Sequence, residues 1–98
     1  MNKSDVIAKL REHEPELKAA GVTRLALFGS VARGDASAQS DVDLMAEFDS
    51  GREFSLLDRV RLENRLADLL GVPVDLTPAN SLKEGVRERA VREAVLAF

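Results

Sequence analysis

Residues 22–48 read VTRLALFGSVARGDASAQSDVDLMAEF, and their pattern predicts the central part of the fold. The run 22–28 is short and mostly apolar, which is typical of a buried strand. A Gly-Ser pair ends this run and opens a short helix over about 30–33, which a polar loop follows. Over residues 41–48 apolar and polar side chains alternate, which is the period of a strand with one face in the core. The stretch therefore predicts two strands connected through a short helix.

Helical spacing precedes this stretch. We expect a first helix capped by Ser4, because apolar residues recur after it at helical intervals. Pro15 has no backbone N–H to donate within a helix, so a break is expected near Glu14, with a second short helical piece after it. Gly21 is the predicted stop of that second piece.

A longer helix is predicted to open at Ser55. Asp58 follows at the position where a carboxylate accepts from the backbone N–H of the cap residue, forming a capping box. Gly71 is the predicted stop, since a residue without Cβ readily adopts the left-handed conformation that ends many helices. The apolar side chains noted along this helix are Leu56, Leu57, Val60, Ala67 and Leu70.

The last part of the chain predicts one more strand and one more helix. The strand is expected over residues 72–76, where Pro73 favours an edge position or a strand start. The helix is expected over about 82–92, and the tail 94–98 fits either more helix or a short edge strand. This order predicts a single domain over residues 1–98, of the α/β (α+β) class, with a small mixed β-sheet and helices packed on it.

The composition excludes several kinds of site. The chain has 98 residues, a net charge of −3, one histidine and no cysteine, tryptophan or tyrosine. Disulfides and cysteine or multi-histidine metal sites are therefore excluded, and any metal must be held by carboxylates, which select magnesium or manganese. The acidic charge and the few aromatics argue against direct binding to nucleic acid. No stretch resembles a signal peptide or a membrane span, so we expect a cytoplasmic protein that does not bind membranes.

Five residues form the candidate site. Gly29 and Ser30 stand at a strand-to-helix turn, where the backbone can approach a ligand closely and unpaired N–H groups suit phosphate oxygens. Asp41 and Asp43 alternate on one predicted strand, which places both carboxylates on the same face, roughly 7 Å apart. Two like charges so close favour a shared dication, and Asp75 on a neighbouring strand can complete the site. A pair of ions held in this way supports in-line displacement at phosphorus.

Residues 29–49, GSVARGDASAQSDVDLMAEFD, resemble the nucleotidyltransferase signature of the DNA polymerase beta superfamily, which is Gly-Ser, a spacer and then Asp-x-Asp. The chain is most similar to the minimal nucleotidyltransferases, small proteins usually encoded beside a HEPN-domain partner in bacterial and archaeal toxin–antitoxin pairs. The resemblance spans nearly the whole chain, and the extension Ala32-Arg33-Gly34 adds to its specificity. It implies a polymerase beta palm-like nucleotidyltransferase fold.

The resemblance assigns a role to each matching residue. Gly29 and Ser30 would hold the β- and γ-phosphates of the nucleotide. Asp41 and Asp43 would bind both magnesium ions, for which manganese can substitute. Asp75 would join them at the catalytic ion and help to activate the attacking hydroxyl.

A sixth residue, Arg33, would contact the phosphates or brace the loop, and the two roles are equally favoured. The implied reaction is transfer of AMP from ATP, with release of pyrophosphate, to a tyrosine hydroxyl of the HEPN toxin. That modification would silence the toxin's RNase activity, and the chain would be the antitoxin of a type VII pair. The chain has no tyrosine, so it cannot modify one of its own.

Two other functions fit the sequence. Neutralisation of the partner by binding alone is favoured by the small size of the chain and by its leucine-rich helix 55–70. Transfer to a small-molecule hydroxyl, as in antibiotic nucleotidyltransferases, would retain the chemistry, although those enzymes usually carry an added domain for the drug. A homo-oligomer or a hetero-oligomer is compatible with each of these functions.

Overall fold

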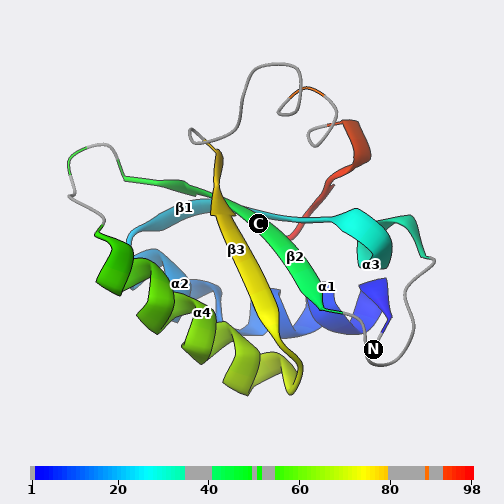
Figure 1. Ribbon diagram of the computed structural model, residues 1–98, viewed down its shortest axis with the longest axis horizontal. Helices are drawn as coiled ribbons and strands as arrows, with labels where there is room; N and C mark the ends of the chain where they lie inside the picture. The colour runs from blue at the N-terminus through cyan, green and yellow to red at the C-terminus, as the bar shows by residue number, and fades with distance from the viewer. Residues whose placement is uncertain (1, 35–40, 50, 52–54, 80–87, 89–91) are drawn as a thin grey trace.

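The computed structural model describes residues 2–34, 41–49, 51, 55–79, 88 and 92–98. Its strands are β1 (Val22–Phe28), β2 (Val42–Phe48), β3 (Val74–Pro78) and β4 (Val95–Leu96). Its helices are α1 (Lys3–Glu12), α2 (Glu14–Ala19), α3 (Gly29–Arg33) and α4 (Leu56–Leu70). The strands form one sheet in the order β3-β2-β1-β4 (Figure 1).

The sheet is mixed, as the sequence predicts. Strand β1 pairs antiparallel with both β2 and β4, whereas β2 and β3 are parallel neighbours. Parallel neighbours need a long crossover connection, and α4 provides it between β2 and β3. The two edges of the sheet are therefore β3 and the short strand β4.

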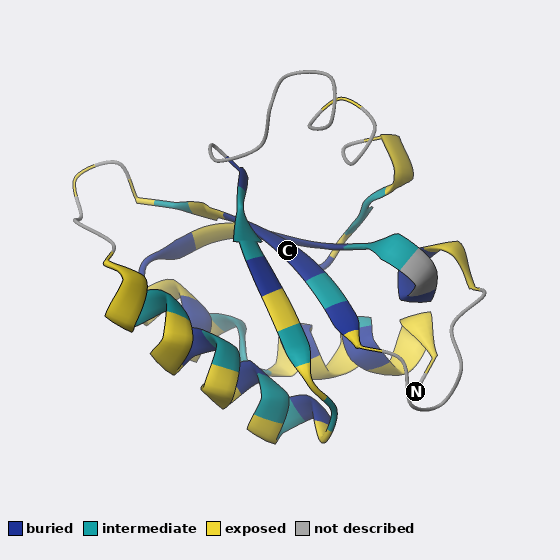
Figure 2. Cartoon of the chain, in the orientation of Figure 1, coloured by how far each residue is buried: buried dark blue, intermediate teal, exposed yellow. Residues whose placement is uncertain are grey.

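Helices α1, α2 and α4 cover one face of the sheet, and the main hydrophobic core lies between them and the strands (Figure 1). We call this side the helix-covered face. Its side chains are aliphatic and almost completely buried, because alternate residues of each strand point toward the helices (Figure 2). The core residues include Val6, Leu10, Leu17, Leu25, Leu27, Val42, Leu44, Leu66 and Leu76.

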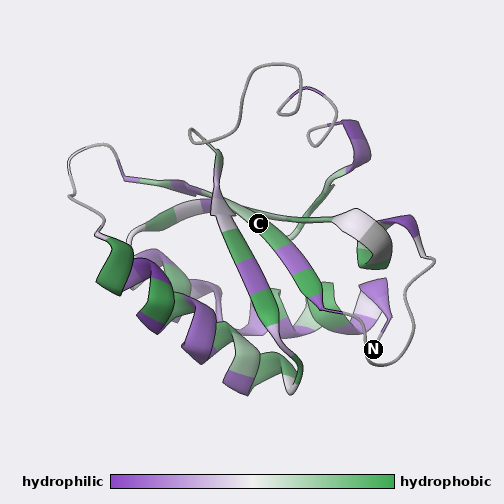
Figure 3. Ribbon diagram, viewed as in Figure 1, coloured by the Kyte–Doolittle hydropathy of each residue, from purple (hydrophilic) through white to green (hydrophobic). Residues whose placement is uncertain are grey.

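The other residues of the same strands point to the opposite side, which carries Asp43 and Asp75 and which we call the acidic face. Ala26 and Met45 form a smaller apolar cluster there together with Ala79. Purple segments alternate with green along β2 and β3 in Figure 3, which follows this division between the two faces. Strand β2 therefore supplies both the core and the candidate site.

The helical prediction for the N-terminal part is confirmed except at its start. The cap of α1 is Asn2, whose side chain accepts a hydrogen bond from the Asp5 N–H at 2.9 Å, so the prediction of Ser4 as the cap is wrong. With Asn2 as the cap, Lys3 and Ser4 themselves belong to the helix. Pro15 lies in the first turn of α2, where its missing N–H costs nothing, and the predicted break between the two helices is confirmed.

Helix α4 begins and ends as predicted. Ser55 accepts from the Asp58 N–H at 3.1 Å while the Asp58 carboxylate accepts from the Ser55 N–H at 3.0 Å, which completes the capping box. Gly71 has a φ of +73°, the left-handed conformation that ends the helix. The helix packs on the sheet through Leu62, Leu66 and Leu70. Three of the leucines and valines noted in the sequence, Leu56, Leu57 and Val60, are instead exposed.

The C-terminal part differs from its prediction in detail. Strand β3 starts at Val74, two residues later than expected, and directly after Pro73, which has no N–H to donate to the sheet; the Pro73 carbonyl accepts from the N–H of Val42. The tail forms the edge strand β4, which confirms one of its two alternatives. Most of the helix expected over 82–92 lies outside the described residues. In the described part of the chain, no helix is both long and apolar enough to cross a membrane.

Candidate active site

Asp43 lies at the centre of the candidate site. It belongs to β2, between Val42 and Leu44, which are both buried in the core. This alternation turns its carboxylate to the acidic face. Its register partners are Phe28 at the end of β1 and Asp75 in the parallel strand β3. The sheet thus brings two predicted acids, 32 positions apart in the sequence, to neighbouring positions.

Gly29 fits against the side chain of Asp43. It is the first residue of α3, directly after β1, and its φ of +77° is a conformation that side chains disfavour. A Cβ atom at this position would collide with the Asp43 carboxylate. Glycine is therefore required here for two independent reasons, the backbone conformation and the close approach. The fold thus brings the Gly-Ser turn next to the Asp-x-Asp strand at Gly29 and Asp43, and their shared role in a site stays a prediction.

The charge on Asp43 is disfavoured in the folded chain. Partial burial raises the pKa of its carboxyl group, and the nearby charges of Asp75 and Asp41 raise it further. The positive charge of Arg33 opposes this rise. Three carboxylates that repel one another are a donor set that a hard dication would stabilise. The electrostatics therefore fit magnesium better than they fit an empty cluster of acids.

Asp41 is exposed and directly precedes β2, so it does not share the regular strand geometry that we expected for it. Among the described residues, no three acidic or histidine side chains come close enough to form a ready-made metal site. Binding of metal by Asp41, Asp43 and Asp75 thus stays a prediction, supported by their mutual repulsion. The carboxylates would have to draw together when an ion binds.

The other two predicted residues lie in α3. Ser30 follows Gly29 in this helix, and its side chain lies outside the described part of the structure. Arg33 ends the helix, and its Nη1 lies 3.6 Å from an oxygen of Glu93. This exposed ion pair matches the bracing role of Arg33, while its effect on the pKa of Asp43 places it near the site. The ion pair fits the bracing role, and contact of Arg33 with phosphates stays a prediction.

Arg59 of α4 is a member of the site that the sequence pattern did not reveal. Its Nη2 lies 3.6 Å from Oδ1 of Asp75, and its Nε donates to Glu63 at 2.9 Å. The only signal in the sequence is the spacing of four between Arg59 and Glu63, which indicates an ion pair along a helix. The contact with Asp75 depends on how α4 packs beside β3, which local sequence does not specify.

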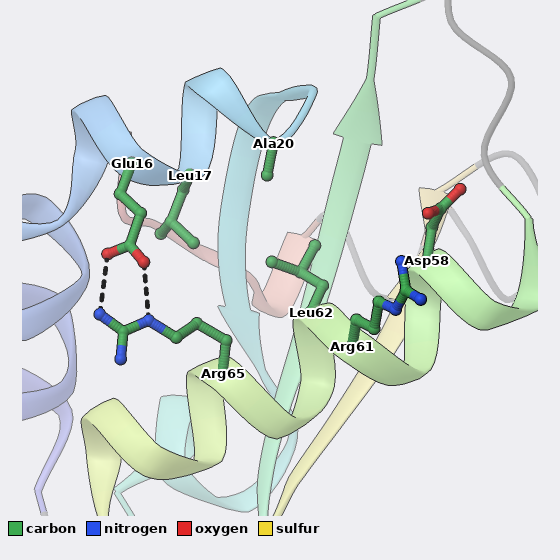
Figure 4. A pocket seen from close by; sticks show the side chains of 7 residues that line it. All are labelled: Glu16, Leu17, Ala20, Asp58, Arg61, Leu62 and Arg65. Carbon is green, nitrogen blue, oxygen red and sulfur yellow. Dashed lines mark hydrogen bonds and ion pairs between the residues drawn. The ribbon is translucent and has the colours of Figure 1, made fainter.

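A groove and a cavity lie close to the strands and helices of the site in the described part of the chain, on opposite sides of the sheet. A groove of about 340 Å³ lies on the acidic face, with Ala26, Met45 and Leu96 among its lining residues. A cavity of about 220 Å³ lies between α2 and α4, where Arg65 pairs with Glu16 across its rim (Figure 4). The cavity includes none of the predicted site residues, whereas the groove shares its strand and face with Asp43.

Comparison with known proteins identifies relatives over almost the whole chain. Residues 7–97 match the nucleotidyltransferase domain family. The protein adenylyltransferase MntA of Thermococcus cleftensis is 41% identical over 87 residues, which cover 88% of this chain and 86% of that protein.

Solved structures share the fold. One that has been assigned to the minimal nucleotidyltransferases superposes with a TM-score of 0.78 at 43% identity, covering 97% of this chain and 95% of the other. A second is the Shewanella oneidensis complex of a tri-AMPylated HEPN toxin with an MNT antitoxin. A chain of this complex superposes with a TM-score of 0.64 at 19% identity, covering 91% of this chain and 70% of that one. At that identity the likeness concerns the fold alone, and the mixed α+β fold that we expected is confirmed.

Proposed function

The chain belongs to the nucleotidyltransferase domain family, among its minimal nucleotidyltransferases, and we propose that it transfers AMP from ATP to a tyrosine hydroxyl of a HEPN-domain protein. The name of the Thermococcus relative supports both the adenylyl group and a protein acceptor. The Shewanella complex, whose HEPN toxin carries AMP, supports a HEPN protein as the partner. Consumption of ATP supports a cytoplasmic location.

The observation that carries the proposal is the contact of Gly29 with Asp43 beside Asp75. A backbone turn without a Cβ lies against an acid whose neighbour across the sheet is a second acid. Triphosphates need both features, since backbone N–H groups bind phosphate oxygens and carboxylates hold the accompanying cations. Few other chemistries require a glycine turn and two acids at one point.

The proposed roles follow from these positions. Asp41, Asp43 and Asp75 would hold magnesium, and Gly29 with Ser30 would bind the β- and γ-phosphates. When bound, magnesium would neutralise charge on the triphosphate and on the leaving pyrophosphate. The protein's own part is to fix these groups on a rigid sheet, so that the nucleotide is oriented before the acceptor arrives.

The reaction itself is a displacement at the α-phosphorus of ATP. The acceptor oxygen bonds to this phosphorus, the bond from phosphorus to the oxygen bridging to the β-phosphate breaks, and pyrophosphate leaves. The acceptor hydroxyl must lose its proton, and Asp75, whose side chain is 59% exposed, is available to accept it. The guanidinium group of Arg59 lies 3.6 Å from Oδ1 of Asp75 and helps to hold this carboxylate in place.

The test is transfer of label from α-labelled ATP with magnesium to a HEPN-domain protein from the same organism. We expect label on a tyrosine of that protein, located by mass spectrometry. The double variant Asp41→Ala/Asp43→Ala should lose activity by a factor on the order of 10³ or more. Asp49→Asn is the matched control, because Asp49 is an exposed acid directly after the same strand and lies outside the site. Absence of label, or equal labelling by the double variant, would overturn the proposal.

The exposed residues of α4 favour a second candidate, neutralisation by binding alone. Leu56 and Leu57 offer apolar surface for a partner without any chemistry. The same experiment separates the two functions. If Asp41→Ala/Asp43→Ala fails to label the HEPN protein but still suppresses its RNase activity fully, binding is sufficient. Label that appears on an added aminoglycoside without the HEPN protein would instead indicate a small-molecule acceptor.

A further inference from the structure

The start of α4 carries a cluster of exposed apolar side chains, which we call the α4 patch. It consists of Leu56, Leu57 and Val60, which are 75%, 57% and 45% exposed. Residues three and four apart are neighbours on a helix surface, so Val60 adjoins both leucines. The same turn of α4 is exposed in Figure 2 and hydrophobic in Figure 3.

The fold itself does not need this cluster. Helix α4 packs on the sheet through Leu62, Leu66 and Leu70, which lie on another side of the helix. The capping box at Ser55 fixes the first turn, so the patch is presented on a rigid element. Single exposed leucines are common, but a contiguous group on one turn is typical of a protein contact surface.

The patch adjoins the candidate active site through Arg59. This residue lies three positions after Leu56 on α4, so the two side chains are neighbours on the helix surface, and its guanidinium group is 3.6 Å from Asp75. Its second partner, Glu63, lies one turn further along α4 and holds the arginine at the β3 edge of the sheet. A protein that sits on the patch therefore lies beside Asp75.

The opposite side of α4 leads away from the site. There Arg65 pairs with Glu16 of α2 at 2.6 Å, on the helix-covered side of the molecule (Figure 4). Of the two flanks of α4, only the one with Arg59 thus connects an apolar surface with an acid of the site. This difference between the two flanks favours a partner protein that receives the nucleotide, since such a protein has to bring its hydroxyl to Asp75.

We propose that the α4 patch docks the protein whose hydroxyl receives the nucleotide, an inference that rests on the proposed function. The partner would carry apolar side chains to cover Leu56, Leu57 and Val60, close to the hydroxyl that it presents at Asp75. A second copy of this chain is a poorer occupant, because it would cover the approach to Asp75 and has no tyrosine to offer.

The test compares Leu57→Ser/Val60→Ser with Leu96→Ser in the full chain. Leu96 is the matched control, an exposed leucine (48%) on β4 at the other edge of the sheet. With the HEPN-domain protein as substrate, we expect the patch variant to raise KM for that protein at least tenfold, with kcat changed less than threefold. Leu96→Ser should change KM less than twofold. The thermal shift that ATP and magnesium cause should stay the same in all three proteins.

Each other outcome overturns the inference. If the wild-type chain transfers AMP and the patch variant has an unchanged KM for the HEPN-domain protein, the α4 patch is not the docking surface. The proposed function is then unaffected. A rise in KM for Leu96→Ser alone would assign docking to the groove on the acidic face. A wild-type dimer that the patch variant converts to a monomer, with KM unchanged, would assign the patch to a second copy. A wild-type chain that transfers no AMP overturns the proposed function and this inference together.

Discussion

The same strands form both faces of the sheet, but one face is buried and aliphatic whereas the other carries acidic side chains. On the helix-covered face, β2 contributes Val42, Leu44 and Ala46, each at most 1% exposed. On the acidic face the same strand contributes Asp43 and Glu47. No polar or charged residue is fully buried in the described part of the chain, so the core face is purely apolar.

The helix-covered face stabilises the fold, whereas the acidic face lowers stability at the residues of the candidate site. The helix-covered face removes aliphatic surface from water, which is the main contribution to folding. The acidic face holds Asp43 near two other carboxylates and partly away from water, which disfavours its charged form. Such unfavourable arrangements are typical of functional sites, because a ligand can relieve them. Substitutions on the two faces should therefore differ in what they change, stability on one face and activity on the other.

Truncation on the helix-covered face should have the largest effect on stability. Leu44 is completely buried at the centre of the core, so Leu44→Ala should lower the free energy of unfolding by about 2–5 kcal/mol. Urea denaturation measures the change, with the adjacent Asp43→Asn as the matched variant on the acidic face. A loss below about 1 kcal/mol for Leu44→Ala would contradict the division of the strand into two faces.

Next in size is the effect of adding a methyl group at the active-site turn. Gly29 and Gly34 both have positive φ, but a Cβ would meet Asp43 only at Gly29, and at Gly34 it would meet nothing within 4 Å. Gly34→Ala should therefore cost only the backbone strain of about 1–2 kcal/mol. Gly29→Ala should cost more and should also abolish AMP transfer, since Asp43 must move. Equal unfolding midpoints and equal activities for the two variants would show that the close approach is unimportant.

Replacement of Arg59, which connects α4 on the helix-covered face with Asp75 on the acidic face, should affect activity more than stability. Arg59→Met keeps the aliphatic length but leaves Asp75 without its cation, and we expect kcat/KM to fall about tenfold, equivalent to ~1.4 kcal/mol. The pair is partly exposed, so the free energy of unfolding should change by less than about 1 kcal/mol. Arg59→Lys should restore part of the activity. A fall in stability that fully accounts for the lost activity would instead make Arg59 a structural residue.

The smallest predicted effect is a pH-dependent penalty from Asp43. The pKa of its carboxyl group is raised in the folded chain, above the ordinary value of 3.8, so the folded state binds the proton more tightly than the unfolded state. Stability is then greatest below that value and is lost as the pH rises through the folded pKa. Without metal, Asp43→Asn should be more stable than wild type at neutral pH by about 0.5 kcal/mol, or about 2–4 °C in Tm.

Melting curves from pH 3 to pH 7 in the presence of a chelator measure this penalty. The difference between Asp43→Asn and wild type should be near zero at the acidic end and should widen as the pH rises. Magnesium with ATP should stabilise the wild type more than the variant. A wild-type protein that is the more stable of the two at neutral pH without metal would contradict an unfavourable acidic face.

Much of the local structure could be predicted because its causes are local. The alternation in β2, the capping box of α4 and the break before Pro15 each depend on neighbours a few residues away. The cap of α1 was the exception, since Ser4 and Asn2 are both good caps and sequence does not rank them. The start of β3 differs from its prediction because the limit of a strand depends on its pairing with β2, a contact between distant segments.

The local sequence was sufficient to predict a glycine turn and two strands that carry carboxylates, because glycine turns and alternating apolar residues act over a few neighbouring positions. Tertiary packing sets the register of Asp75 with Asp43, because this register depends on the crossover through α4. Packing also brings Arg59 to Asp75 and leaves Leu56 exposed. Those outcomes depend on how a helix rotates and packs beside a sheet edge, and this is set by the core as a whole.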